Sequence, residues 1–326
     1  MKESYLAVIT DCEFASFEPE RRELTGLAEV RKYCCRNEEE VIAAAAEADA
    51  ILVQYAPITR RVIESLRHCR VIGRYGIGVD MIDLDAATDR GIPVVNVPDY
   101  CVEEVSDHTL ALLLAVSRKI LLLHNSVEGG QWDFSVAAPV FRIKDLTVGL
   151  VAFGKIARRV AEKLHGFGCR IVAYDPFAKQ DTARALGVEL VDLQTLLEDS
   201  DIISVHAPLT EQTRHLFDGE AFRRMKKTAY LINTSRGAVI DESALEHALD
   251  AGLVGGAALD VLEEEPVSQG STLIGRDNVL LTPHTAFYSV ASLLDLQVLT
   301  ARGVAQVLRG QKSEYLVNRS LIDKQS

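Results

Sequence analysis

The stretch Leu146-Thr-Val-Gly-Leu-Val-Ala-Phe-Gly-Lys-Ile-Ala157 passes from an apolar run straight into a helical pattern. Two phosphate-binding motifs compete for it. Gly149, Gly154 and Lys155 nearly complete the loop that binds nucleoside triphosphates, but Ile156 stands where that loop needs a Ser or Thr for magnesium. The stretch therefore predicts a strand, a tight turn and a helix, while an ordinary turn with no ligand remains an alternative.

The second motif is the dinucleotide pattern G-x-G-x-x-G, aligned on Ala152, Gly154 and Ala157. Only the middle glycine is present, the one that lets the backbone approach a pyrophosphate at the helix N-terminus. Alanine fits the first position if that position needs no unusual backbone angle. The next apolar run, Arg170–Tyr174, ends in Asp175, 21 positions beyond Gly154. A carboxylate there can bind the adenosine ribose and repels a 2′-phosphate, so we predict NAD rather than NADP.

Length and composition limit the number of domains, the classes of partner and the cellular location that we expect. Its 326 residues correspond to about two domains. The formal net charge of −12 argues against nucleic acid or an anionic membrane as a partner. The six cysteines have no CxxC pair or metal-ligand spacing, so we expect reduced thiols and no metal site. With no signal-peptide pattern and no long apolar segment, we expect a cytoplasmic protein.

Short β-branched runs alternate with helical patterns along almost the whole chain. The predicted strands are Leu6–Thr10, Ala50–Gln54, Val71–Gly73, Pro93–Asn96, Thr147–Ala152, Arg170–Tyr174, Ile202–Val205, Ala229–Asn233, Gly256–Leu259 and Val279–Leu281. The predicted helices include Glu38–Ala48, Glu103–His124, Lys155–His165, Glu242–Ala251 and Ser289–Leu308. Continuous apolar strands separated by helices predict α/β architecture with parallel sheets covered on both faces.

Three polar residues follow apolar runs where strands of such a sheet would end. They are Arg236, Glu265 and His284, spaced by 29 and 19 positions. Ligands of open α/β sheets bind at the carboxyl ends of the strands. The set suits hydride transfer to a 2-oxo acid, since an arginine can clamp the carboxylate and a histidine can transfer the proton. A carboxylate beside the histidine would orient it and favour its protonated form.

Each of these residues also has an ordinary structural explanation. Glu265 could belong to a solvated acidic turn, His284 could be a hydrogen-bonded loop histidine, and Arg236 could cap a helix. Their occurrence together, each after its own strand, favours the catalytic interpretation.

The chain resembles the D-isomer-specific 2-hydroxyacid dehydrogenases from Ala50 to Asn318. The matching motifs are Gly73-Arg-Tyr-Gly-Ile-Gly-Val-Asp80, Asn96-Val-Pro-Asp-Tyr100, Asn233-Thr-Ser-Arg-Gly237, Gly256-Ala-Ala-Leu-Asp-Val261 and Leu281-Thr-Pro-His284. Within the family, Pro283–Ser289 and Val317-Asn318 look like the branch of the C-terminal-binding-protein type. That branch also includes NADH-sensing transcriptional corepressors.

The resemblance implies a role for each matching residue. Arg236 would bind the substrate carboxylate, His284 would act as the acid/base and Glu265 as its partner. The residues implied at the cofactor are Gly154, Lys155, Ile156, Asp175, His206, Pro208, Thr213, Thr234, Arg236, Asp260 and His284, with Asp260 near the nicotinamide carboxamide. Those expected at the substrate are Tyr55, Tyr75, Gly76, Ile77, Gly78, Arg236, His284 and Phe287.

The resemblance also implies a Rossmann NAD-binding domain inserted into a flavodoxin-like substrate domain, both doubly wound. We place the substrate domain at residues 1–100 and 289–326 and the NAD domain at 101–288. A region near 103–146, with its leucine-rich helix and Trp132, looks like the family's dimerisation arm, so we expect a homodimer; a buried, structural Trp132 is the alternative.

The leading prediction is an NAD(H)-dependent enzyme that interconverts a small D-2-hydroxy acid and its 2-oxo acid. A corepressor-like NADH sensor and a phosphite-type dehydrogenase with the same three residues are the alternatives. The segment Gln54–Pro57 contains no cation, which makes 3-phosphoglycerate a less favoured substrate, although Arg60, Arg61 and Arg74 leave this open. Aromatic residues near the expected site suggest an apolar tail.

Overall fold

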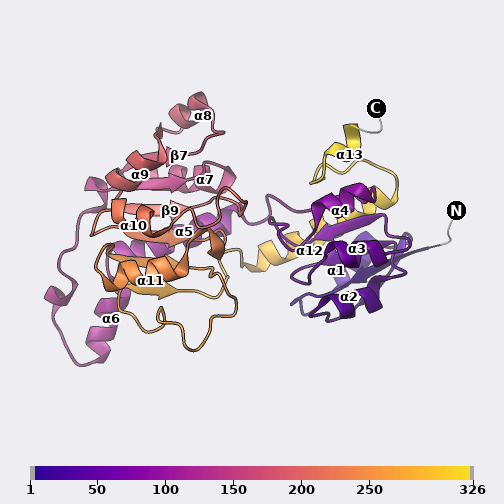
Figure 1. Cartoon of the computed structure of the whole chain (residues 1–326), viewed down its shortest axis with the longest axis horizontal. Coiled ribbons are helices and arrows are strands. Elements are labelled where there is room, and N and C mark those ends of the chain that lie inside the picture. The colour runs from indigo at the N-terminus through magenta and orange to yellow at the C-terminus, as the bar shows by residue number, and fades with distance from the viewer. Residues whose placement is uncertain (1–3, 324–326) are drawn as a thin grey trace. The chain divides into compact units, whose positions relative to one another are not determined.

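The computed structural model describes residues 4–323 as two compact units. Of these residues, 4–101 and 289–323 form the first unit, and Val102–Tyr288 form the second. The chain thus leaves the first unit once and returns to it. Each unit is an α/β layer structure of its own (Figure 1).

The first unit has a five-stranded parallel sheet in the order β2-β1-β3-β4-β5. Its elements are β1 (Tyr5–Ile9), α1 (Glu18–Glu23), β2 (Ala28–Lys32), α2 (Glu38–Ala45), β3 (Ala50–Val53), α3 (Arg60–Ser65), β4 (Val71–Arg74), α4 (Leu84–Asp89), β5 (Val94–Val95), α12 (Val290–Leu308) and α13 (Ser320–Asp323). The order reverses between β1 and β3, which makes this pair the switch point of the sheet.

The second unit has a seven-stranded parallel sheet in the order β12-β11-β10-β9-β6-β7-β8. Its elements are α5 (Val102–Ser117), α6 (Ile120–Glu128), β6 (Thr147–Val151), α7 (Lys155–Leu164), β7 (Arg170–Tyr174), α8 (Gln180–Ala185), β8 (Glu189–Leu190), α9 (Leu193–Asp199), β9 (Ile202–Val205), α10 (Gly219–Arg224), β10 (Tyr230–Asn233), α11 (Glu242–Asp250), β11 (Gly256–Leu259) and β12 (Val279–Leu281). Here the switch point lies between β6 and β9.

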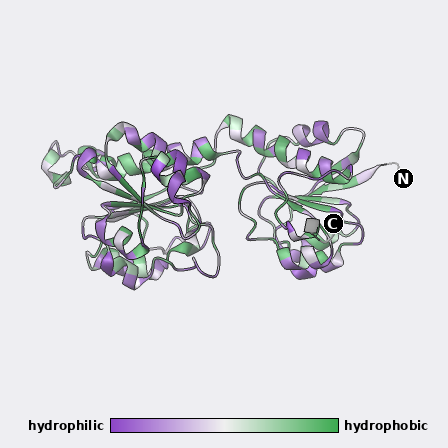
Figure 2. Ribbon diagram, turned by 90° about the horizontal axis from the view of Figure 1, so that it is seen from above, coloured by the Kyte–Doolittle hydropathy of each residue, from purple (hydrophilic) through white to green (hydrophobic). Residues whose placement is uncertain are grey.

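Both sheets are covered on both faces, which explains the unbroken apolar runs. In β1, Val8 packs into one hydrophobic cluster while Ala7 and Ile9 pack into another on the opposite face. In β9, Ile202 and Ile203 divide in the same way between two clusters. Figure 2 shows hydrophobic strands in the middle of each unit and hydrophilic residues on the outer helices. The predicted α/β class with parallel sheets is therefore confirmed.

The single helix predicted over Glu103–His124 is wrong, because the structure has two helices there, bent by 58°. The Ser117 hydroxyl donates to the carbonyl oxygen of Leu113 at 2.6 Å, a local bond that competes with the helix ladder. Lys119 then takes a left-handed conformation with φ 52°, which ends α5 and redirects the chain. None of the α6 side chains is buried, and Trp132 beyond it is 91% exposed, so the buried alternative for Trp132 is also wrong.

Two strands and several short helices lay outside the sequence prediction. Strand β2 has the sequence Ala-Glu-Val-Arg-Lys and buries only Val30, as expected for an edge strand. Strand β8 is two residues long and lies at the edge of the other sheet. Such strands lack the apolar run that reveals central strands. Apart from the break between α5 and α6, the differences among the predicted strands and helices lie at their ends.

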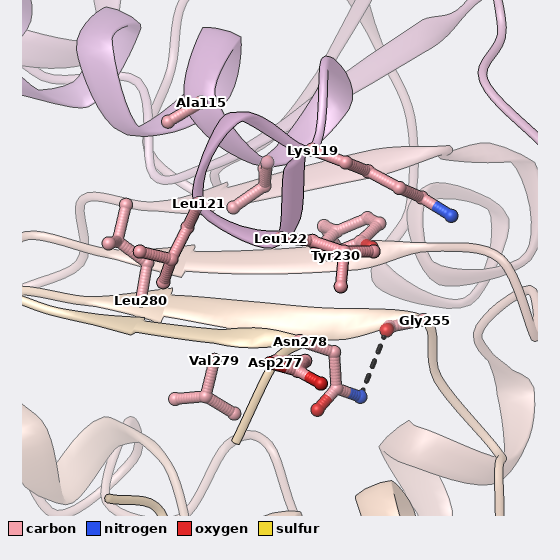
Figure 3. Close-up of a pocket in the computed structure, with 11 residues that line it drawn as sticks. Ala115, Lys119, Leu121, Leu122, Tyr230, Gly255, Asp277, Asn278, Val279 and Leu280 are labelled. Carbon is pink, nitrogen blue, oxygen red and sulfur yellow. Dashed lines mark hydrogen bonds between the residues drawn. The ribbon is translucent and has the colours of Figure 1, made fainter. Parts of the chain in front are cut away.

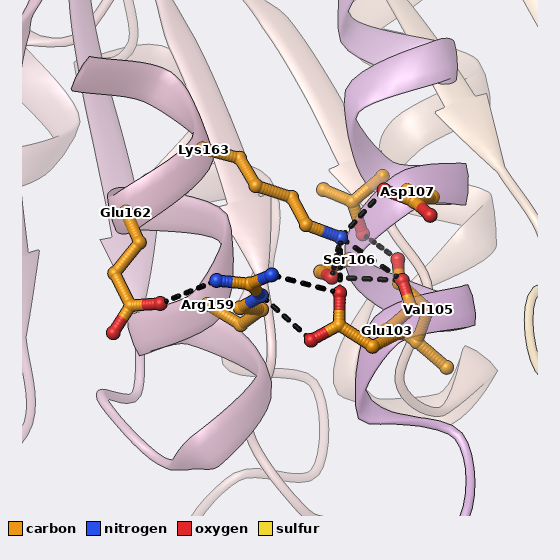
Figure 4. A network of polar contacts seen from close by, with 8 residues as sticks. Glu103, Val105, Ser106, Asp107, Arg159, Glu162 and Lys163 are labelled. Atoms are coloured by element: carbon orange, nitrogen blue, oxygen red, sulfur yellow. Dashed lines mark hydrogen bonds and ion pairs between the residues drawn. The ribbon is translucent and has the colours of Figure 1, made fainter. Parts of the chain in front are cut away.

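A network of ion pairs joins α5 to α7 in the second unit (Figure 4). The Lys163 ammonium donates to the carbonyl oxygen of Glu103 at 3.2 Å and to Ser106 Oγ at 2.7 Å, and it pairs with Asp107. Arg159 Nε lies 2.7 Å from a carboxylate oxygen of Glu103. These contacts hold the first turn of α5 against the helix that follows the glycine loop.

Among residues 4–323, no single helix is long and apolar enough to cross a membrane. Helices α5 and α6 pass that test only when taken together, as a bent pair.

Candidate active site

The glycine loop lies at the switch point of the second sheet, between β6 and α7. Gly149 sits inside β6, and a Cβ there would collide with Ser200 Oγ and Leu196, so this glycine serves packing against α9. That placement excludes the triphosphate loop. A Cβ on Gly154 would meet nothing within 4 Å, so the space above the N-terminus of α7 is open. This space and the first amides of the ten-residue helix suit a pyrophosphate.

Ala152 corrects one expectation about this loop. Its φ is 68°, in the left-handed region, whereas the sequence argument allowed alanine only if no unusual angle was needed. Its backbone N–H donates to the carbonyl oxygen of Tyr174 at 2.8 Å, which fixes the turn at the end of β6. The first position of the dinucleotide pattern therefore requires a positive φ, which explains why glycine is usual there. In this chain, Ala152 adopts that conformation instead.

We expect Ala152→Gly to stabilise the protein by about 0.5–1 kcal/mol, because glycine removes the cost of a Cβ at positive φ. Differential scanning calorimetry should show a higher Tm. The matched control is Ala157→Gly, which lies in helix α7 and should lower the Tm, since glycine costs about 1 kcal/mol in a helix. A lower Tm for both variants would contradict the strain at Ala152.

Asp175, at the end of β7, binds the glycine loop that follows β6. Its carboxylate accepts the N–H of Phe153 at 2.8 Å and the N–H of Phe177 at 2.8 Å. The side chain thus lies beside the glycine loop at the end of β7, the position at which an acid can reach a ribose.

Lys155 and Ile156 begin α7, directly after Gly154. Four more residues expected at the cofactor follow β9 or β10, namely His206, Pro208, Thr213 and Thr234. Burial lowers the pKa of His206 to about 4, so its imidazole is neutral at physiological pH, and Nε2 lies 3.0 Å from Ser204 Oγ. The Thr213 hydroxyl donates to the carbonyl oxygen of Pro208 at 2.6 Å, which closes the loop after β9. Thr234 Oγ1 lies 3.1 Å from Thr109 Oγ1 on α5. Both loops lie at the carboxyl edge of the sheet, where β9 neighbours β6 and β10 is the next strand beyond β9.

Arg236, Glu265 and His284 follow three neighbouring strands, β10, β11 and β12. The ring nitrogen Nδ1 of His284 lies 2.7 Å from Glu265 Oε2. The other carboxylate oxygen of Glu265 accepts the N–H of Leu262 at 3.0 Å. The pKa of Glu265 is lowered: burial opposes its ionisation, but the hydrogen bond and charge of His284, the Leu262 N–H and the charge of Arg236 outweigh it. The three predicted residues therefore lie together, with a carboxylate that stays ionised at neutral pH.

The turn that carries Arg236 is fixed by its neighbours. The buried Asn233 side chain donates to the carbonyl oxygen of Arg236 at 2.9 Å and accepts the Ser235 N–H at 3.0 Å. A Cβ on Gly237 would collide with the backbone of Leu262, so this turn packs directly against the turn that leads to Glu265. The Asn-x-x-Arg-Gly pattern thus has a structural basis that spacing alone did not reveal.

Asp260 lies under the His284 loop. It is 2% exposed, and its carboxylate accepts the hydroxyl of Thr282 and the N–H groups of Thr285 and Ala286, the latter two at 2.9 Å. The backbone of His284, with φ 48°, also donates to the carbonyl oxygen of Asp260 at 2.7 Å. The described contacts of Asp260 thus position the histidine, a role that sequence reasoning missed.

The residues expected at the substrate divide between the units. Phe287 belongs to the second unit, and its ring centroid lies 6.3 Å from that of His284. In the first unit, Tyr55 follows β3, and Gly76, Ile77 and Gly78 follow β4.

Tyr75 requires a correction. Its side chain is 1% exposed, and its hydroxyl donates to Glu20 Oε1 at 2.8 Å, so the ring belongs to the core of the first unit and faces no substrate. The sequence alone does not show whether an aromatic side chain next to a glycine loop points into the core or toward the substrate.

Two small hollows of about 150 and 220 Å³ lie at the opposite, amino-terminal edge of the second sheet. Leu121 and Leu122 reach from α6 toward the strands that carry Tyr230 and Leu280 (Figure 3). These hollows are remote from the strand ends that carry the acid/base pair. Among residues 4–323, no group of three or more His, Cys, Asp or Glu side chains could hold a metal ion.

Comparisons with known proteins identify relatives of this chain. Residues 110–286 match the NAD-binding domain of the D-isomer specific 2-hydroxyacid dehydrogenases. A glyoxylate reductase of Thermofilum pendens is 39% identical over 87% of this chain and 85% of its own length. D-3-phosphoglycerate dehydrogenase 2 of Arabidopsis thaliana, a chloroplastic protein, is 39% identical over 85% of this chain, which spans only 45% of that protein.

A solved structure extends the match over nearly the whole fold. D-lactate dehydrogenase from Aquifex aeolicus, complexed with NAD and lactic acid, superposes with a TM-score of 0.84 at 27% identity, covering 98% of both chains. The chain therefore belongs to the D-isomer-specific 2-hydroxyacid dehydrogenases, an NAD-dependent oxidoreductase family, and carries their NAD-binding domain.

Proposed function

We propose that this enzyme reduces a small 2-oxo acid to the D-2-hydroxy acid, and catalyses the reverse oxidation, with Arg236, Glu265 and His284 as its catalytic residues. The observation that carries the proposal is the 2.7 Å contact between His284 Nδ1 and Glu265 Oε2. These two residues follow β12 and β11, and Arg236 follows β10, the next strand of the same sheet.

The chemistry assigns each residue one task. Arg236 holds the substrate carboxylate through paired N–H donors. His284 keeps Nδ1 on Glu265, so Nε2 donates a proton to the carbonyl oxygen as that oxygen becomes a hydroxyl. NADH held by the loop of Gly154 and by Asp175 would supply the hydride, and with it both electrons, for the carbonyl carbon. Glu265 stabilises the imidazolium before the proton leaves, and in oxidation the same groups act in reverse.

The substrate ligands in the first unit belong to the same proposal. The backbone of Gly76, Ile77 and Gly78 would bind the carboxylate, and Tyr55 would face the tail, as would Phe287 in the second unit. Tyr55 is 45% exposed, so its ring is accessible in the first unit. The aromatic character of these side chains supports a tail that is apolar.

The preference for NAD over NADP is also a proposal, and it rests on Asp175. We expect Asp175→Ala to lower the ratio of kcat/KM for NADH to that for NADPH by about tenfold or more, because the carboxylate no longer repels a 2′-phosphate. Steady-state kinetics with both cofactors measures this ratio.

Two variants separate that repulsion from a loosened loop. Asp175→Asn can still accept the Phe153 N–H but is neutral, so it should also relax the preference. Asp181→Ala removes an exposed carboxylate from α8 and should leave the ratio within twofold. An unchanged ratio in both Asp175 variants would remove the assignment.

A homodimer and a cytoplasmic location remain part of the proposal. The region 103–146 presents exposed large apolar side chains, which support a protein interface. They are Ile120, Val127, Trp132, Phe134, Val136, Val140 and Phe141.

The assignment to the C-terminal-binding-protein branch is not supported by the relatives described above, which are named as a glyoxylate reductase, a D-3-phosphoglycerate dehydrogenase and a D-lactate dehydrogenase. An NADH sensor without catalysis is the alternative that kinetics must exclude, and phosphite oxidation is another. The test is NADH consumption against a panel of 2-oxo acids, with phosphite and NAD in a parallel assay. Tight NADH binding without turnover of any 2-oxo acid would favour the sensor.

A further inference from the structure

A hollow of about 490 Å³ lies at the carboxyl edge of the sheet in the first unit. The loops that follow β1, β2 and β3 line it, so it occupies the switch point of that sheet, where open α/β sheets hold ligands. The lining residues are Asp11, Cys12, Glu13, Cys34, Cys35, Arg36, Tyr55 and Ala56. None of the roles proposed above uses any of them except Tyr55.

Asp11 builds the turn on which Tyr55 stands. Its carboxylate is only 9% exposed and accepts the N–H groups of Gln54 at 3.2 Å, Tyr55 at 2.6 Å and Ala56 at 3.1 Å. The Thr10 hydroxyl donates to the same carboxylate at 2.9 Å. Three successive backbone N–H groups form the kind of concavity that binds anions, and here the protein's own carboxylate fills it.

Apart from the Asp11 carboxylate, whose oxygens are taken up by the N–H groups of the turn, the buried side chains that line the hollow carry no charge. Burial raises the pKa of Cys12, and burial with the nearby charge of Glu40 raises the pKa of Cys35 to about 11, so both thiols stay protonated. Glu13 and Arg36 are exposed and of opposite charge, and exposed charges are strongly screened by water and salt.

The strand order shows how far the hollow lies from the loop proposed to bind the substrate carboxylate. Gly76–Gly78 follow β4, which neighbours β3, and β3 neighbours β1. Strands in a sheet lie about 4.8 Å apart, so the hollow begins about one strand spacing from the loop proposed to hold the carboxylate. A substrate whose carboxylate is bound by the Gly76–Gly78 loop would extend its tail toward Tyr55. A substrate without a tail would not reach the hollow.

We propose that Asp11 is a positioning residue that sets Tyr55 for the tail of the substrate, and that the tail taken in this hollow is uncharged. The proposal rests on the proposed function and narrows its substrate class to 2-oxo acids with a neutral tail. An anionic tail would find the three N–H groups of the turn already used and a fixed carboxylate behind them.

The experiment compares three probe substrates with NADH. Glyoxylate carries only hydrogen on its carbonyl carbon and does not reach the hollow, 2-oxohexanoate has a neutral aliphatic tail, and phosphohydroxypyruvate has a charged one. In Asp11→Asn, one of the two accepting oxygens becomes an NH2 donor that faces the N–H groups of the turn, so the turn that carries Tyr55 loses part of its hydrogen bonding. We expect the ratio of kcat/KM for 2-oxohexanoate to that for glyoxylate to fall about tenfold.

Matched variants make the result specific. Asp49→Asn alters another buried carboxylate of this unit, one that accepts the Leu6 N–H at the opposite edge of the sheet, and should leave the ratio within twofold. Tyr55→Ala keeps the Asp11 hydrogen bonds possible and should lower the ratio as Asp11→Asn does. This second variant tests the tail site even where Asp11→Asn fails to fold.

Two results would overturn the proposal. One is an unchanged ratio in Asp11→Asn and Tyr55→Ala. The other is a wild-type preference for phosphohydroxypyruvate that Arg36→Ala abolishes, which would make the hollow an anion site. Failure of the proposed function looks different, because the wild type would then reduce none of the probes, glyoxylate included.

Discussion

Replacing His284 by asparagine is expected to lower kcat for 2-oxo acid reduction by about 10²–10⁴-fold, the usual contribution of a positioned general acid. Asparagine tolerates the left-handed backbone that His284 adopts at φ 48°, so the loop should keep its shape. The amide cannot give up a proton at Nε2's position. Because His284 is expected at the cofactor as well as at the substrate, fluorescence titration of the dissociation constant for NADH separates a loss of proton transfer from a loss of cofactor binding.

His215 offers a matched control in the same unit. It also has a left-handed backbone, with φ 53°, and its ring lies 2.6 Å from a carboxylate oxygen of Glu263. His215→Asn therefore removes a second histidine–glutamate pair without touching the proposed acid/base, and kcat should stay within about twofold. If His284→Asn retained more than about a tenth of the wild-type kcat, the acid/base role would be lost.

Replacing Arg236 by lysine is expected to lower kcat/KM for the 2-oxo acid by about 10- to 150-fold, the equivalent of roughly 1.5–3 kcal/mol for one lost hydrogen bond to a charged group. Lysine keeps the charge but not the planar pair of donors that fits a carboxylate. The loss should fall on the 2-oxo acid, through a raised KM together with a lower kcat, while the KM for NADH moves less.

Arg223→Gln is the control for a general loss of positive charge, since Arg223 is exposed in the last turn of α10. It should leave kcat/KM within twofold. An Arg236→Lys enzyme with the wild-type kcat/KM would show that the carboxylate is held elsewhere.

The sequence predicted the fold class because the central strands are buried on both faces and so read as apolar runs. Strand β9 has the predicted bounds, as do β7, β11 and β12. The edge strand β2 escaped prediction, since only Val30 of it is buried. The break between α5 and α6 also escaped, because it depends on one hydroxyl bond at Ser117 and one backbone angle at Lys119, neither of which disturbs the apolar pattern.

The candidate site shows the same division. Arg236, Glu265 and His284 could be found because each is a polar residue directly after an apolar run. Asp260 could be placed near the site, but its use as an anchor for the His284 loop depends on backbone N–H groups that sequence spacing does not display. Asp11 lies 43 residues or more from the backbone groups that it binds, so no local pattern connects them.

The most direct test of the central claim follows the hydride itself. The wild-type protein is given NADH deuterated at the transferred position together with a 2-oxo acid, and the product is examined by NMR and chiral chromatography. The proposed mechanism predicts deuterium on C2 of the D-2-hydroxy acid, and about 10²–10⁴-fold slower formation of the same product by His284→Asn. A protein that binds NADH tightly yet transfers no deuterium to any 2-oxo acid, or that yields the L-isomer, would contradict the account.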